Sequence, residues 1–108
     1  RFCIAQGAGV HVAGALMLAG GEVMRAFGLT RLLGVFDVRM VRIYNMIGAA
    51  PEVLGSMGEG RDKISVGLWA FRPEDRLKVL RRAGVSSDLS EHWFARSFGF
   101  PIRRALAA

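Results

Sequence analysis

The segment QGAGVHVAG, residues 6–14, joins a short strand-like run at residues 1–4 to an apolar helical pattern. Small residues at such a corner leave backbone N–H groups free to bind a phosphate or a pyrophosphate. The glycine spacing is not that of a dinucleotide-binding loop, and the G-K-[ST] ending of a P-loop is missing. The segment is therefore either a phosphate contact or a flexible connector.

Basic side chains gather on and beside one predicted helix, where Lys78, Arg81 and Arg82 share a side. The chain has 15 Lys and Arg against 9 Asp and Glu, a net charge of +6, which favours an acidic partner. Because no helix-turn-helix, zinc-finger or aromatic RNA-binding pattern occurs, an acidic protein is a better candidate than a specific nucleic-acid sequence. The predicted docking residues are Arg72, Arg76, Lys78, Arg81 and Arg82.

Residues that bind metals or act as nucleophiles are few and scattered. The chain has one cysteine, Cys3, and two histidines, His11 and His92, that are far apart in sequence. Their spacing does not match any set of metal ligands, so we expect no metal site. A single cysteine forms no internal disulfide, which fits a reducing cytoplasm. No compact apolar run is long enough to span a bilayer, so we expect no membrane anchor.

Hydrophobic periodicity and capping residues predict the elements that position these groups. The predicted elements are a strand at 1–4, a helix at 10–27, a strand at 32–36, a helix from its cap at Asp37 to Gly48, strands at 52–57 and 63–71, a helix from Pro73 to Gly84, and a last helix capped by Ser87 or Asp88. Helices interleaved with strands indicate an α/β layered sheet, and 108 residues suffice for one domain.

Two of these elements carry further information. The strand at 63–71 is apolar or small on both alternating faces, which predicts that both faces are covered. The helix at 10–27 contains Gly14, Gly20 and Gly21, each of which costs about 1 kcal/mol relative to alanine. We therefore expect another backbone or a ligand to approach this helix closely.

Three motifs resemble those of the acyl-homoserine-lactone synthases, which make the autoinducers of bacterial quorum sensing. The RF at residues 1–2 is similar to the end of the family's E-x-S-R-F strand motif. MVRIYNMIGAAP, residues 40–51, is similar to its M-x-R-I-x-x-x-x-G-x-x-P block, and GEGRDKISVGLW, residues 58–69, resembles a late strand of several members. The three motifs follow one another in the family's order over most of the chain.

The resemblance implies a GNAT-like fold, with a layered mixed sheet and flanking helices. It implies a cytoplasmic acyltransferase that joins the amine of S-adenosylmethionine to an acyl group delivered by acyl carrier protein. The enzyme then closes the lactone and releases methylthioadenosine. S-adenosylmethionine is a substrate in this reaction, so no cofactor is expected, and the acidic carrier protein becomes the partner for the basic helix.

The resemblance also assigns roles to particular residues. Arg1 matches the motif arginine, whose guanidinium would hold polar groups near the reacting centre, and it is the catalytic candidate. The acyl pocket would be lined by Phe2, Met17, Phe36, Met40, Ile43 and Tyr44. Each of these apolar residues has core packing as its alternative role.

Two departures from the family bear on activity. The N-terminal part that binds S-adenosylmethionine in the family has no counterpart in these 108 residues, nor do the Glu and Ser of the motif before Arg1. We therefore expect this chain to be the C-terminal portion of a synthase, residues 1–108 forming one domain, and to be inactive by itself.

Two other functions remain open at this point. Gln6 followed by Gly9 partly resembles the Q/R-x-x-G-x-G/A loop of coenzyme A-dependent GNAT-type N-acetyltransferases. A non-enzymatic, basic nucleic-acid-binding module would also account for the positive charge.

Overall fold

The structure is a computed structural model that describes residues 4–102 of the chain. Helices and strands follow one another along these residues. The elements are α1 (Val10–Ala26), β1 (Arg31–Asp37), α2 (Val38–Ile47), β2 (Glu52–Met57), the short 3₁₀ helix η1 (Gly60–Asp62), β3 (Ile64–Ala70), α3 (Pro73–Ala83) and α4 (Ser87–Phe98). These bounds agree with the predicted elements to within one or two residues. The predicted strand at 1–4 falls mostly outside the described residues, and Ile4 lies in no strand but packs against the core.

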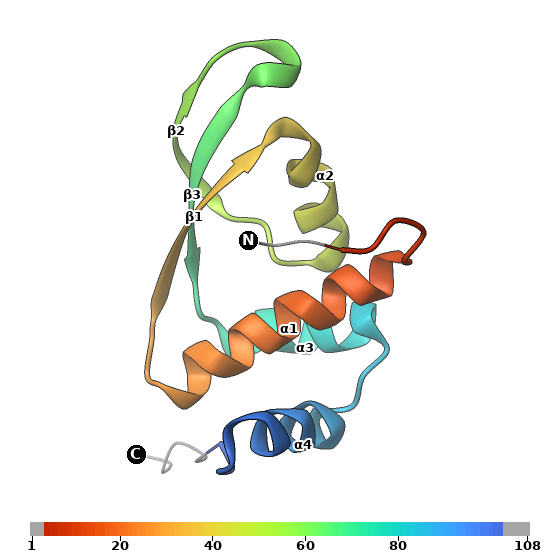
Figure 1. Ribbon diagram of the computed structural model, residues 1–108. Helices are drawn as coiled ribbons and strands as arrows, with labels where there is room; N and C mark the ends of the chain where they lie inside the picture. Colours follow the sequence, from red (N-terminus) through yellow and green to blue (C-terminus); the bar gives the residue numbers. More distant parts are fainter. Residues whose placement is uncertain (1–3, 103–108) are drawn as a thin grey trace.

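The three strands form one antiparallel sheet in the order β1-β3-β2, so β3 is central. Figure 1 shows the curved sheet along one side of the molecule and the helices on the other. The expected α/β fold class with flanking helices is thus confirmed. Pairing is regular between β1 and β3, whereas the register between β2 and β3 shifts between Val53 and Gly55.

The prediction that both faces of β3 are covered is wrong for the described residues. Ser65 and Gly67 are buried on the inner face, but Ile64 and Val66 on the outer face are exposed. The physical reason is that β1, β2 and β3 present their inner faces to the same layer of helices. The outer face carries Leu33, Val35, Met57, Ile64 and Val66.

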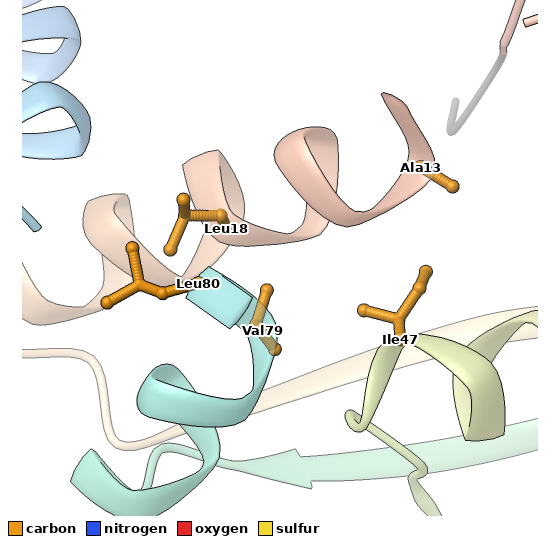
Figure 2. Close-up of a cluster of buried hydrophobic side chains, with 5 residues drawn as sticks. All are labelled: Ala13, Leu18, Ile47, Val79 and Leu80. Carbon is orange, nitrogen blue, oxygen red and sulfur yellow. The ribbon is translucent and has the colours of Figure 1, made fainter. Parts of the chain in front are cut away.

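The core lies where α1 crosses α3 and the end of α2. Its buried side chains, drawn in Figure 2, are Ala13, Leu18, Ile47, Val79 and Leu80. Gly14 allows the closest approach between α1 and α3, because a Cβ built on it would lie 3.3 Å from the Cα of Ala83. The prediction that another backbone approaches this helix is therefore confirmed at Gly14.

Three helices end on a glycine with positive φ, at Gly48, Gly84 and Gly99, the usual left-handed stop. At the other end of α2, the carboxylate of Asp37 accepts a hydrogen bond from the backbone N–H of Arg39, as the predicted cap requires. The predicted cap of α4 is wrong by one residue. The hydroxyl of Ser86, not of Ser87 or the carboxylate of Asp88, accepts the hydrogen bond of the Leu89 N–H at 3.1 Å.

Aromatic rings fill the space between α2 and the sheet. Phe36, Tyr44 and Trp69 pack edge to face, with ring centroids 5.1–5.8 Å apart. The rings lie close to the backbone because Gly34 and Gly67 stand opposite each other on β1 and β3. The indole N–H of Trp69 donates a 2.8 Å hydrogen bond to the carbonyl of Ala49.

Within residues 4–102, no helix is both long enough and apolar enough to cross a membrane.

Candidate functional site

A cavity of about 450 Å³ lies between α1, α3 and the sheet. Its volume is in the range of about 300–1,000 Å³ that is typical of small-molecule sites, and most of its lining is apolar. The cavity lies beneath α1, where the ends of the strands meet the start of α3. The apolar side chains that line it are Met17, Leu18, Met24, Leu32, Leu68, Trp69, Phe71 and Val79.

One face of α1 forms the wall of this cavity. Met17, Gly20, Gly21 and Met24 all line it, and their spacing of three, four and seven residues places them on one side of a helix. A Cβ built on Gly20 or Gly21 would meet no atom within 4 Å, in contrast to Gly14. The helix face therefore presents a gap between two methionines, which are flexible side chains that adapt to irregular apolar surfaces.

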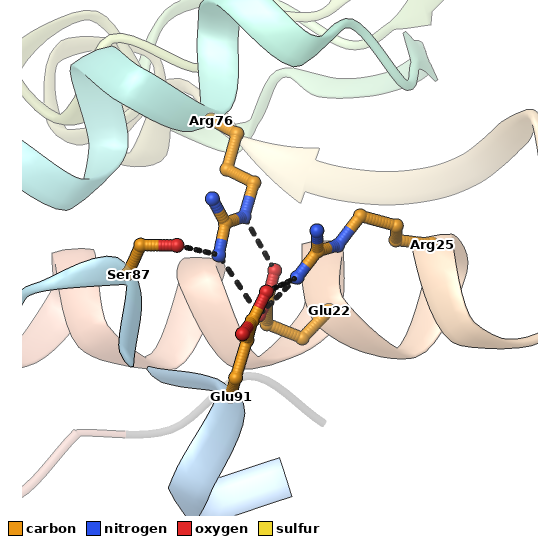
Figure 3. A network of polar contacts seen from close by, with 5 residues as sticks. All are labelled: Glu22, Arg25, Arg76, Ser87 and Glu91. Atoms are coloured by element: carbon orange, nitrogen blue, oxygen red, sulfur yellow. Dashed lines mark hydrogen bonds and ion pairs between the residues drawn. The ribbon is translucent and has the colours of Figure 1, made fainter. Parts of the chain in front are cut away.

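The cavity has a polar side at Glu22, which is 1% exposed. Figure 3 shows that the carboxylate of Glu22 holds two arginines from different helices. Arg76 on α3 donates from Nε to Oε1 at 2.8 Å and from Nη2 to Oε2 at 3.2 Å, and Arg25 donates to Oε2 at 3.1 Å. The same Nη2 atom of Arg76 donates to the hydroxyl of Ser87, and Arg25 also bonds to Glu91. We call these five residues the α1–α3–α4 network.

The charge of Glu22 is stabilised by this network. Burial by itself would raise the pKa of the Glu22 carboxyl, but the hydrogen bond from Arg76 and the charges of Arg25 and Arg76 outweigh it, so its pKa lies below the ordinary value of 4.5. The bond to Glu22 raises the pKa of Arg76 in turn. The carboxylate is therefore ionised and fully engaged at neutral pH, which suits a structural anchor more than a proton-transfer group.

The predicted docking residues separate into two groups. Arg76 has a side chain that is only 12% exposed and is paired with Glu22, so it offers no free charge to a partner. The other four are exposed, and Arg72 and Lys78 also line the cavity. Lys78 lies 3.8 Å from Asp75, a loose contact that leaves its ammonium accessible. The exposed cations of the set are Arg72, Lys78, Arg81 and Arg82.

The residues predicted for the acyl pocket lie in different places. Met17 lines the cavity, whereas Phe36 and Tyr44 are buried with Trp69 in the aromatic cluster and are not among its lining residues. Ile43 packs against the core and Met40 is half-buried on α2. Burial raises the pKa of the Tyr44 hydroxyl, and the charge of Asp37 adds to this effect.

Arg1 and Phe2 lie outside the described residues, so their predicted roles remain predictions, and Cys3 lies outside them as well. The QGAGVHVAG corner forms an exposed turn at residues 6–7, followed by Gly9 as the backbone cap of α1. Among the described residues, no group of three or more His, Cys, Asp or Glu side chains is arranged to hold a metal ion.

Sequence reasoning missed several parts of the site. The lining residues Met24, Leu32 and Trp69 come from three elements. Met24 could have been found from its seven-residue spacing to Met17, whereas Leu32 and Trp69 depend on the register of β1 and β3, in which they are directly opposed. The pairing of Glu22 with Arg76 joins positions 54 residues apart and has no local signal in the sequence.

Comparisons with known proteins bear on the fold. No protein-family model matches the chain, and no curated protein matches it. The chain is similar to the solved structure of MesI, described as a CoA-dependent acyl-homoserine lactone synthase, with a TM-score of 0.67 and 21% sequence identity. The match covers 82% of this chain and 46% of MesI, so the chain spans less than half the length of that protein. The chain thus has the fold of part of an acyl-homoserine lactone synthase, as the sequence motifs imply.

Proposed function

We propose that this chain is the acyl-binding part of an N-acyl-homoserine lactone synthase. The observation that supports this proposal best is the apolar cavity of about 450 Å³ beneath α1, in a fold similar to that of MesI. The three sequence motifs at residues 1–2, 40–51 and 58–69 support it as well.

In the proposed reaction, the amine of S-adenosylmethionine attacks the carbonyl carbon of an acyl thioester. An amide C–N bond forms, the C–S bond breaks, and the amine loses a proton while the carrier leaves as a thiol. The carboxylate of the methionine part then attacks the γ carbon, and the bond to the sulfonium breaks. The products are the lactone and methylthioadenosine. Arg1 holds polar groups at the reacting centre, as the resemblance implies, because its planar guanidinium can donate two parallel hydrogen bonds.

The acyl chain occupies the cavity beneath α1. An apolar wall stabilises such a chain by about 0.8 kcal/mol for each buried methylene group. Met17 and Met24 provide a wall that can adapt to chains of different shape. The aromatic cluster around Trp69 supports the sheet side of the cavity.

The acyl donor is a phosphopantetheine thioester, on either acyl carrier protein or coenzyme A. Both carriers are anionic, and the exposed cations near the cavity, Arg72 and Lys78, suit either one. Arg81 and Arg82 in the last turn of α3 extend the positive surface for an acidic carrier protein. The CoA dependence of MesI makes coenzyme A the necessary comparison in any assay.

The test is to express the whole gene that encodes this chain and to assay the purified product with S-adenosylmethionine. One arm supplies acyl carrier proteins loaded with chains of four to twelve carbons, and the other supplies the matching coenzyme A thioesters. We expect mass spectrometry to detect an N-acyl-homoserine lactone and methylthioadenosine in equal amounts with one donor class, and neither product from an Arg1→Ala variant. Unchanged S-adenosylmethionine in both arms would refute the proposal.

A second assay uses the 108-residue chain alone. Because the chain spans 46% of MesI, we expect it to bind an acyl chain but to form no lactone. Turnover by the 108 residues would show that the acceptor site also lies within them.

A further inference from the structure

The two adjacent glycines of α1 are not explained by helix packing. Gly14 has a packing reason, since its missing Cβ lets the backbone of Ala83 approach. Gly20 and Gly21 have no such neighbour, because a Cβ at either position would meet no atom within 4 Å. Both have helical backbone conformations that alanine would adopt more readily. What they do share is a place on the wall of the cavity.

The position of the glycines within that wall is specific. Met17 precedes Gly20 and Gly21 by about one turn, and Met24 follows them by about one turn, on the same face of α1. Met24 is buried and Met17 is half-buried, so both ends of the stripe are held by packing. Gly21 is half-buried and Gly20 is exposed at the rim. The missing side chains therefore widen the cavity at one defined point along α1.

We propose that Gly20 and Gly21 determine which acyl chains this cavity accepts. This inference rests on the proposed function, in which the cavity holds the acyl group of the donor. The space beside the two glycines takes the part of the chain that passes along α1 between Met17 and Met24. A side chain at either glycine would fill that space, so longer or bulkier acyl groups would be excluded before short ones. Gly20 and Gly21 touch the substrate chain and are specificity-determining residues.

The test measures binding to the 108-residue chain, so it does not depend on turnover. The probe is a dansyl-labelled undecanoic acid, whose fluorescence reports entry into an apolar cavity, displaced by unbranched fatty acids of four to twelve carbons. The variants are Gly20→Ala, Gly21→Ala and Gly21→Leu. The matched control is Ala19→Leu, which places the same leucine side chain at the neighbouring exposed position, one that does not line this cavity.

We expect Gly21→Leu to weaken binding of the longest acids by on the order of 10- to 100-fold and to leave the shortest acid unaffected, because overfilling a packed site is costly. Gly20→Ala and Gly21→Ala should shift the preferred chain length downward by a smaller amount. The same two alanine variants should raise the thermal midpoint of unfolding by about 4–8 °C, since they remove a helix-weakening glycine. A higher thermal midpoint combined with weaker binding of long chains shows that the glycines contact the ligand. A glycine needed for helix packing would instead lower the midpoint when replaced.

Two results would overturn the inference, and they separate it from the proposed function. If the unmodified chain binds the probe and the glycine variants keep the same chain-length preference, the glycines do not set specificity, while the acyl cavity stands. If the unmodified chain binds neither the probe nor any fatty acid, both the inference and the assignment of the cavity to an acyl chain are wrong. An equal loss of binding in Ala19→Leu would also refute a specific role for Gly20 and Gly21.

Discussion

At the scale of single residues, Glu22 is the position where burial and charge oppose each other most directly. Burying a carboxylate costs several kcal/mol, and the cost is recovered only when cations and hydrogen bonds replace water. Arg25 and Arg76 supply both, from within α1 and from α3. The pair with Arg76 also removes that arginine from the exposed cations of α3. A charge that the sequence suggests for a partner is thus used inside the fold.

We expect Glu22→Gln to destabilise the chain by about 3–5 kcal/mol, because the variant leaves the largely buried Arg76 without its paired carboxylate and leaves Arg25 with Glu91 alone. Urea unfolding at pH 7 measures the loss. Glu91→Gln is the matched control, since Glu91 is more exposed and, among residues 4–102, forms its ion pair with Arg25. A similar loss in the two variants would contradict the central role of Glu22.

Glu22 also gives the stability a pH dependence. Its pKa is lowered in the folded chain, so the unfolded chain, with an ordinary pKa near 4.5, binds the proton first as the pH falls. The stabilisation is complete above pH 4.5 and is lost as the pH falls from there through the lower folded pKa. Urea midpoints measured from pH 7 to pH 3 should fall for the natural chain and fall less for Glu22→Gln. Parallel profiles would mean that other carboxylates dominate.

At the scale of elements, the opposed glycines of β1 and β3 let the aromatic rings lie against the sheet. A Cβ at Gly34 would be 2.7 Å from a ring carbon of Trp69, and one at Gly67 would be 2.6 Å from a ring carbon of Phe36 and 2.8 Å from Pro51. Flat contact of this kind is possible only where the strand has no side chain. The pair therefore fixes how closely α2 and its loop approach the sheet.

We expect Gly67→Ala to destabilise the chain by about 1–3 kcal/mol, because Phe36 and Pro51 must move. The near-ultraviolet circular dichroism of the aromatic cluster should weaken at the same time. Gly55→Ala on β2 is the control, since a Cβ there meets no atom within 4 Å. An unchanged aromatic spectrum in Gly67→Ala would contradict this account of the sheet.

The start of α4 gives a second prediction for an element. Ser86→Ala should cost about 1 kcal/mol, since it removes the acceptor for the N–H of Leu89. Asp88→Ala, which removes only a favourable charge in the first turn, should cost less. Chemical denaturation of the two variants checks the order, and the reverse order would restore Asp88 as the cap.

At the scale of the whole molecule, local signals predicted the elements and failed to predict their mutual placement. Asp37, Gly48, Pro73 and Gly84 act on their immediate neighbours, so the ends of α2 and α3 were predictable. The cap of α4 was misplaced because three adjacent residues, Ser86 to Asp88, can all accept the same hydrogen bond.

The differences between the predicted and the observed site have a different origin. Whether a cation is free depends on what packs against it, and Glu22 meets Arg76 only after α1 and α3 are brought together. The burial of each face of β3 depends on which face the helices pack against. A strand that is apolar on both faces does not indicate which face this is. The cavity is a property of the space between α1, α3 and the sheet, so Met17 alone of its apolar lining was predicted.

The remaining exposed cations give a prediction for the assembled molecule. Charge reversal at Arg81 and Arg82, both exposed in the last turn of α3, should weaken binding of an acidic acyl carrier protein several-fold. Binding titrations with the carrier protein at low and high salt measure this loss of affinity, which should become smaller as salt screens the charges. Arg39→Glu at the start of α2, where the arginine side chain is 82% exposed, is the control, and an equal effect there would indicate only non-specific attraction.

The exposed outer face of the sheet affects which fluorescent probes can be used to follow unfolding of this protein. Leu33, Val35 and Met57 are 64%, 70% and 80% exposed there and lie beside Ile64 and Val66. Dyes whose fluorescence increases on apolar surfaces, such as anilinonaphthalene sulfonate, will therefore bind to the native chain and fluoresce, as they do with molten globules. Melting curves recorded with such dyes will start from a high baseline. The tryptophan signal of Trp69, which is half-buried and packs edge to face against Tyr44, is the sounder reporter of native structure.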